Sequence, residues 1–274
     1  MGGRGSKSGE PKKPKKNGEA LGLIVYNPDA VKETESVHTR EEVEELANKN
    51  GLKVTKEVFD KIPPDLLYDS LSGVVGMYAE YGVSPQDTIG GIQLRSGSGA
   101  YGSSQKGQYG MISLYDGWYT NPTAFQKSYE SDAKSHWHPQ GDSSDVAVHE
   151  AAHRLEWMLG NKAWNTEAYP SGKKVPNDWS AMFGNLHGNY ATKDIVETAI
   201  RNIKKTPYGK GKSNSELRRG ISRYSDFHND GRRWSETFAE AITDDYRNGS
   251  NANPLSKEIA KLTKAYLKGW KKVG

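Results

Sequence analysis

The sequence of 274 residues contains no cysteine. This absence excludes disulfide bonds, thiol nucleophiles and any zinc site built on cysteine thiolates, and it leaves the redox compartment of the protein undetermined. It also excludes the zinc deaminase signature, which combines an H-x-E motif with a pair of cysteines. A metal centre in this chain would therefore have to be built from other side chains.

Long hydrophobic runs are also absent. Hydrophobic residues make up 34% of the chain, and no stretch approaches the run of about 18 apolar residues that a membrane span needs, so we expect no such span. The first residues are polar and lack the apolar core of a standard secretory signal. A length of 274 residues is enough for one large domain or two small ones.

The net charge of +4 is unevenly distributed. Residues 1–20 contain six basic and two acidic side chains, which leaves 32 of each sign in the remainder. This first segment is rich in Gly, Ser, Lys and Pro, and we expect it to be a disordered tail. Its simplest interpretation is a solubilising leader, and contact with nucleic acid or another anionic surface is the alternative.

The rest of the chain alternates helical patterns with glycine-rich loops and shows no internal repeat. Residues 21–26 are expected to form a first strand or a docking segment, and residues 92–95 and 108–115 to form a hairpin or two neighbouring strands. A capping box at Thr39 starts the first expected helix. Further helices are expected over residues 54–62, 66–81, 125–134, 145–159, 192–203, 233–245 and 255–270, with Gly82 and Gly160 as stop signals. Irregular structure is expected over 160–191, and a basic loop over 204–214.

One short segment carries a chemical motif, His149-Glu150-Ala-Ala-His153. On a helix, His149 and His153 are one turn apart and project from one face, so both can reach a single Zn²⁺. Glu150 can then reach a zinc-bound water without occupying the metal. The alternative is a surface helix with two ordinary histidines, but apolar neighbours such as Val148 and Leu155 indicate that this helix is largely buried.

A catalytic zinc needs a third protein ligand. The class of enzymes with a third histidine in H-E-x-x-H-x-x-G-x-x-H is excluded, because Glu156 and Leu159 stand at the last two motif positions. Glu236 and Glu240 are four residues apart on an otherwise apolar helical segment and share one face. One of them can bind the metal while the other supports a ligand histidine. The alternative is that both face solvent.

Other residues are weaker candidates. Glu167 lies near the position from which a thermolysin-like enzyme draws its third ligand. His136 and His138 precede the metal helix and could line a cleft or bind a second metal, although ordinary loop histidines would look the same. His228 is a candidate proton donor or alternative ligand.

The combination of motifs resembles a known family. His149-Glu150-x-x-His153, followed 83 positions after His153 by Glu236-Thr-Phe-Ala-Glu240-Ala, is similar to zincin metallopeptidases of the gluzincin type related to the catalytic domain of anthrax lethal factor. Similar domains occur in proteins encoded by bacteriophages and mobile elements. The resemblance covers about residues 60–250 and implies that Glu236 is the third zinc ligand, that Glu240 supports a ligand histidine and that Tyr224 stabilises the oxyanion. Tyr224 lies 12 positions before Glu236, a looser match than the motif itself.

We therefore expect an α+β, zincin-like metallopeptidase domain over residues 56–274, mostly helical, with a small mixed sheet beside the H-E-x-x-H helix. A partly helical extension over 21–55 and the basic tail over 1–20 would precede it. The expected activity is zinc-dependent endopeptidase, with one Zn²⁺ per chain, Glu150 as general base and a peptide or protein as substrate. A strand edge beside the metal helix would align an extended peptide. Nucleic acid would be contacted only through the tail.

Two other functions share these residues. A structural protein of a phage or mobile element could retain a zincin-like fold with a vestigial site, although the complete set of His149, Glu150, His153 and Glu236 argues against decay. A toxin or effector with one narrow target would use the same chemistry, and it would give no signal in a general protease assay.

Overall fold

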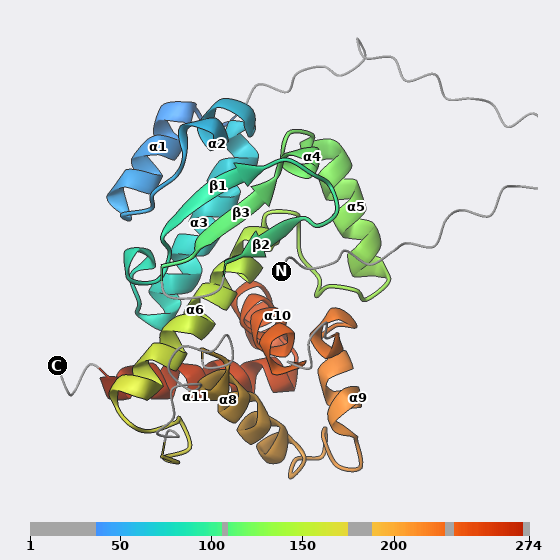
Figure 1. The fold of residues 1–274 in the computed structure, drawn as a ribbon. Coiled ribbons are helices and arrows are strands. Elements are labelled where there is room, and N and C mark those ends of the chain that lie inside the picture. Colours follow the sequence, from blue (N-terminus) through green and yellow to red (C-terminus); the bar gives the residue numbers. More distant parts are fainter. Residues whose placement is uncertain (1–36, 106–108, 175–187, 228–232, 271–274) are drawn as a thin grey trace, which may run out of the picture.

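The computed structural model describes residues 37–105, 109–174, 188–227 and 233–270 (Figure 1). The described residues are 63% helix with one small three-stranded mixed sheet, so the expected α+β, mostly helical class is confirmed. Among the described residues, no helix is both long and apolar enough to cross a membrane. The expected strand at 21–26, the tail at 1–20 and His228 lie outside the described residues.

Among the described residues, the α-helices before the sheet are α1 (Arg40–Lys49), α2 (Lys56–Lys61) and α3 (Pro64–Tyr81). The capping box predicted at Thr39 is present, since its side chain accepts from the backbone of Glu42 while the Glu42 carboxylate accepts from the backbone of Thr39. Gly82 ends α3 in the left-handed conformation with φ of 65°, as its lack of a side chain allows. Because Val43 and Ala47 of α1 are buried in the main core, this helix is part of the packed body.

The sheet consists of β1 (Gly91–Arg95), β2 (Gly102–Ser104) and β3 (Met111–Tyr115). Its order is β1-β3-β2, with β1 parallel and β2 antiparallel to the central β3. The two predicted strands are neighbours, but they are parallel, so the hairpin alternative is wrong. The glycine- and serine-rich segment between the two predicted strands contains β2. Backbone hydrogen bonds to β3 create this strand, and they leave no alternating pattern of side chains in the sequence.

The sheet leads into α4 (Asp116–Tyr119), α5 (Pro122–Lys134) and α6 (Asp145–Asn165). Figure 1 shows α6 running through the middle of the molecule, with the sheet on one side and the last helices on the other. The predicted stop at Gly160 is wrong, because α6 continues for another turn and more. Gly160 and Ala163 are both buried. Tertiary packing therefore stabilises the helix beyond Gly160, although glycine is a weak helix former.

The described residues after α6 form the helices α8 (Gly188–Ile203), α9 (Asn214–Arg219), α10 (Arg233–Asn248) and α11 (Pro254–Trp270). The predicted helices at 192–203, 233–245 and 255–270 are present with longer ends. Helix α9 was not predicted, although a capping box formed by Ser213 and Glu216 marks its start. A single 3-10 turn over Tyr224–Asp226, η3, connects α9 toward α10.

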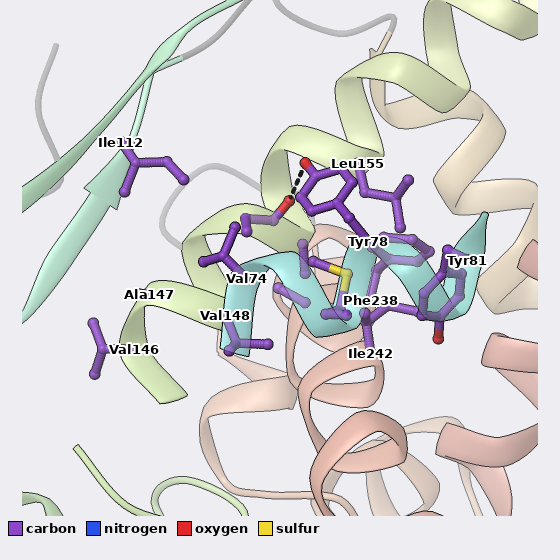
Figure 2. Packing of buried hydrophobic residues seen from close by; sticks show 14 of the residues in the cluster. Val74, Tyr78, Tyr81, Ile112, Val146, Ala147, Val148, Leu155, Phe238 and Ile242 are labelled. Atoms are coloured by element: carbon purple, nitrogen blue, oxygen red, sulfur yellow. Dashed lines mark hydrogen bonds between the residues drawn. The ribbon is translucent and has the colours of Figure 1, made fainter. Parts of the chain in front are cut away.

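The core lies where α3, α6 and α10 meet. Figure 2 shows Tyr78 of α3 and Leu155 of α6 beside Phe238 of α10. A Cβ atom on Gly73 of α3 would lie 2.9 Å from Val148 Cγ2, so this glycine permits the close approach of α3 to α6. The Tyr78 hydroxyl donates to the Ala151 carbonyl at 3.0 Å. Helix α3 therefore supports α6 along the H-E-x-x-H segment.

Leu71 of α3 tests how much this core contributes to stability. Its side chain is 0% exposed, and replacement by alanine leaves a cavity that costs about 2–5 kcal/mol of unfolding free energy. Urea denaturation followed by circular dichroism would measure the loss. Val37→Ala is the control, because Val37 is 82% exposed and its loss should change stability by no more than about 0.5 kcal/mol. Equal effects of the two substitutions would contradict the assignment of Leu71 to the core.

Candidate metal centre

Three side chains from two helices converge at one point. His149 and His153 of α6 and Glu236 of α10 each direct one ligand atom to within 4.8 Å of the others. The two histidine Nε2 atoms both lie 3.4 Å from the same Glu236 oxygen, Oε2. Among the described residues, these two histidines and one glutamate are the group whose spacing suits a metal ion.

The packing of α6 against α10 brings these residues together. Phe238 and Ile242 of α10 are fully buried, and their apolar surface packs into the core shared with α6. The Thr237 hydroxyl donates to the Ser225 carbonyl at 2.7 Å, which fixes the start of α10 against η3. The apolar packing of α6 against α10 therefore holds the polar side chains of the two helices in position.

His149 is supported from behind by a buried carboxylate. Its Nδ1 lies 3.0 Å from Glu240 Oε1, and Ser222 Oγ donates to Glu240 Oε2 at 2.7 Å. Burial opposes ionisation of Glu240, but contacts with His138 and His149 lower its pKa to about 2. Since an ionised carboxylate only accepts hydrogen bonds, Nδ1 of His149 must be the donor. Nε2 is thereby directed at Glu236.

His153 has a second buried carboxylate behind it. Its Nδ1 lies 3.2 Å from Glu156 Oε2, and Ser235 Oγ donates to the same oxygen at 2.7 Å. From the sequence, we used Glu156 only to exclude the motif with a third histidine. Its contact with His153 was not predicted. The available signal was its spacing of three residues from His153, which places both side chains on one face of the helix.

The charges around the two rings favour a cation between them. Burial disfavours protonation of His149, but Glu236 and Glu240 outweigh it and raise the pKa of His149 to about 9. Burial has the same effect on His153, whose pKa is nevertheless raised well above its usual value by Glu236 and Glu156. The two histidines in turn hold the pKa of Glu236 well below its usual range, although burial opposes this. Either protons or a metal ion can supply the positive charge.

The donor set fits Zn²⁺ in number, type and spacing. Glu236 Oε2 is buried and has no hydrogen-bond partner among the described residues, and the 3.4 Å separations from the two Nε2 atoms are long for hydrogen bonds. Two atoms bound to a tetrahedral zinc at roughly 2.0–2.1 Å lie about 3.3–3.4 Å apart. Two histidines and a glutamate are also a known ligand set of catalytic zinc sites.

Glu150 lies beside the ligands, under the edge of the sheet. It is buried, and burial raises the pKa of its carboxyl group while His149 and His153 oppose that rise. A Cβ atom on Gly102 would lie 3.0 Å from Glu150 Cγ, so the absence of a side chain lets β2 pass close to Glu150. The unpredicted strand β2 is therefore the edge of the described sheet that borders the site.

Tyr224 and His138 lie beside His149 and its supporting carboxylate. The Tyr224 ring centroid is 6.0 Å from that of His149 and 5.4 Å from that of His138. The pKa of Tyr224 is raised well above its usual value by burial and then by the charges of Glu236, Glu150 and Glu240. His138 Nδ1 lies 3.3 Å from Glu240 Oε1, so His138 contacts the carboxylate that supports His149.

Two of the weaker candidates, His136 and Glu167, lie outside the ligand group. Nε2 of His136 pairs with the Arg219 carbonyl at 2.9 Å at an exposed position, as expected of an ordinary loop histidine. Glu167 follows the end of α6 with a positive φ of 54° and is not among the grouped ligands. The thermolysin-like arrangement therefore has no support in the described geometry.

Comparisons with protein-family models, curated proteins and solved structures find no significant match to this chain. The likeness to zincins consequently rests on the two sequence motifs. Any assignment of function depends on the chemistry of the centre formed by His149, His153 and Glu236.

Proposed function

We propose that this protein is a zinc-dependent peptidase with a zincin-like catalytic domain. The main support is the Glu236 oxygen that lies 3.4 Å from the Nε2 atoms of both His149 and His153 without a hydrogen-bond partner. In this proposal His149, His153 and Glu236 hold one zinc ion. A Zn²⁺ bound there would polarise a substrate carbonyl and lower the pKa of a bound water to about 7.

Glu150 is assigned the proton transfers. Its carboxyl group neighbours the ligand group, and burial raises its pKa while His149 and His153 oppose that rise. In amide hydrolysis, Glu150 would accept a proton from the attacking water and deliver that proton to the leaving amine. One buried carboxyl group, inaccessible to bulk solvent, can thus serve as base and then as acid.

Tyr224 is assigned the stabilisation of negative charge on the substrate oxygen. Backbone hydrogen bonds hold it in place, since its N–H donates to the Trp137 carbonyl at 3.1 Å. A neutral phenol donates one hydrogen bond, and such a donor stabilises an oxyanion more strongly in a water-excluded site than in water. The raised pKa of Tyr224 keeps this proton on the hydroxyl.

Strand β2 is assigned the alignment of the substrate. It is an edge strand of the described sheet, and its Gly102 lies directly against Glu150. An extended peptide that pairs with this edge would gain main-chain hydrogen bonds irrespective of its sequence. The scissile bond would then lie beside Glu150.

Metal removal provides the experiment. The purified protein would be incubated with a pooled peptide library, and cleavage would be read by mass spectrometry before chelation, after chelation and after Zn²⁺ is returned. We expect cleavage to stop on chelation and to recover with one zinc per chain. Glu150→Ala carried through the same protocol controls for contaminating peptidases. Cleavage that persists without metal, or a wild-type protein that takes up no zinc, would contradict the proposal.

A further inference from the structure

We infer that Glu156, with Ser235, is a positioning pair that sets the zinc affinity of the centre through His153. The inference rests on the proposed zinc site and concerns residues that do not touch the metal. Two contacts carry it: Glu156 Oε2 lies 3.2 Å from His153 Nδ1 and accepts from Ser235 Oγ at 2.7 Å.

The first contact determines which nitrogen of His153 faces the metal. A carboxylate accepts but does not donate, so Nδ1 of His153 carries the proton toward Glu156. The lone pair of the neutral ring is then on Nε2, which lies 3.4 Å from Glu236 Oε2. A carboxylate behind a ligand histidine also makes that ring a stronger donor to the metal.

The second contact connects the ring to the other ligand helix. Ser235 is in the first turn of α10, directly before the ligand Glu236, and its hydroxyl lies within 3.4 Å of His153 Nδ1 as well. Through Glu156 and Ser235, the orientation of a ligand on α6 is coupled to the position of the ligand on α10. Neither helix could shift along the other without breaking these hydrogen bonds.

The two ligand histidines are therefore supported in different ways. His149 depends on Glu240 of α10, which also contacts His138 and Ser222. His153 depends on a carboxylate from its own helix, three residues farther on. Because Glu156 is on α6 itself, it holds the His153 ring even when α10 is displaced. The hydrogen bond from Ser235 to Glu156 then aligns α10 with α6.

The burial of Glu156 is costly without such a role. Its side chain is 1% exposed, on a helix whose neighbouring residues Ala152 and Leu155 are fully buried. Removing a carboxylate from water carries a large penalty that hydrogen bonds must offset. A structural link between α6 and α10 alone could be made by a neutral glutamine, so the charge distinguishes the two roles.

Zinc affinity provides the test. Wild type, Glu156→Gln, Glu156→Ala and Ser235→Ala would be stripped of metal and titrated with Zn²⁺ against a chromophoric chelator. We expect the dissociation constant to rise about 10- to 100-fold in both Glu156 variants and about 2- to 10-fold in Ser235→Ala, which removes one hydrogen bond to the Glu156 carboxylate. Glu130→Gln, at an exposed position on α5, is the control and should bind as wild type does.

Thermal melts of the stripped proteins separate positioning from stability. Glu156→Gln keeps the shape of the side chain, so we expect its melting temperature to remain near that of wild type while its zinc affinity falls. A Glu156→Gln protein with wild-type affinity would overturn the inference, whatever its melting temperature. If Glu156→Ala does not fold, Glu156→Gln and Ser235→Ala decide. A wild type that binds no zinc would instead overturn the proposed function.

Discussion

Replacing Glu150 with alanine should leave zinc bound and slow peptide hydrolysis by about 10²- to 10⁴-fold, the usual contribution of a general acid–base group. The reason is that Glu150 lies beside the ligand group but is not part of it. Its loss removes the group that would move the proton, while His149, His153 and Glu236 remain. Zinc content by elemental analysis and the rate of peptide cleavage would be measured on the same preparation.

Glu150→Gln is the matched variant for that experiment. It preserves the volume that faces Gly102 but cannot accept a proton at neutral pH. Both substitutions should therefore be inactive while folded and zinc-bound. Hydrolysis at the wild-type rate in either variant would remove Glu150 from this role, and loss of zinc from both would indicate that Glu150 belongs to the ligand set.

Glu236→Ala should lose zinc. This substitution removes one of three ligand atoms that lie within 4.8 Å of one another. Because removal of a supporting residue behind a ligand already costs about 10- to 100-fold in metal affinity, loss of a ligand itself should cost more than about 100-fold. The protein should remain folded, since Glu236 is partly exposed at the end of α10 that borders the site.

Glu167→Ala is the matched control, because Glu167 was the rival third ligand in the sequence. It lies beyond the C-terminal end of α6 and outside the ligand group, so one zinc per chain should be retained. Zinc lost from Glu167→Ala and kept in Glu236→Ala would reverse the assignment and favour a thermolysin-like arrangement. Equal zinc content in all three proteins would place the metal elsewhere.

Much of the fold could be predicted because local signals were strong. The capping box at Thr39 and the stop at Gly82 are read within a few residues, and they mark helix ends that the structure contains. The helix that carries His149 and His153 was predictable for the same reason, since a separation of four residues places two side chains on one face of any helix. The parallel pairing of β1 with β3 was not predictable, because pairing depends on residues 20 positions apart.

The sequence by itself determined the composition of the candidate site. It excluded thiolate ligands, paired His149 with His153 through helical periodicity, and selected Glu236 and Glu240 as carboxylates on an apolar segment. These inferences hold because they depend on residue chemistry and on the period of one helix.

Only the tertiary structure decided which groups meet. It directed Glu236 Oε2 to both Nε2 atoms, joined Ser235 of α10 to Glu156 of α6 and laid Gly102 of β2 against Glu150. Burial of Gly160 and Ala163 in the packed body carried α6 past Gly160, where local propensity predicted an end. Each of these outcomes depends on contacts between segments distant in the sequence or on burial that offsets a weak local preference. Long-range contacts and burial leave no periodic signal in the sequence, so they could not be predicted from it.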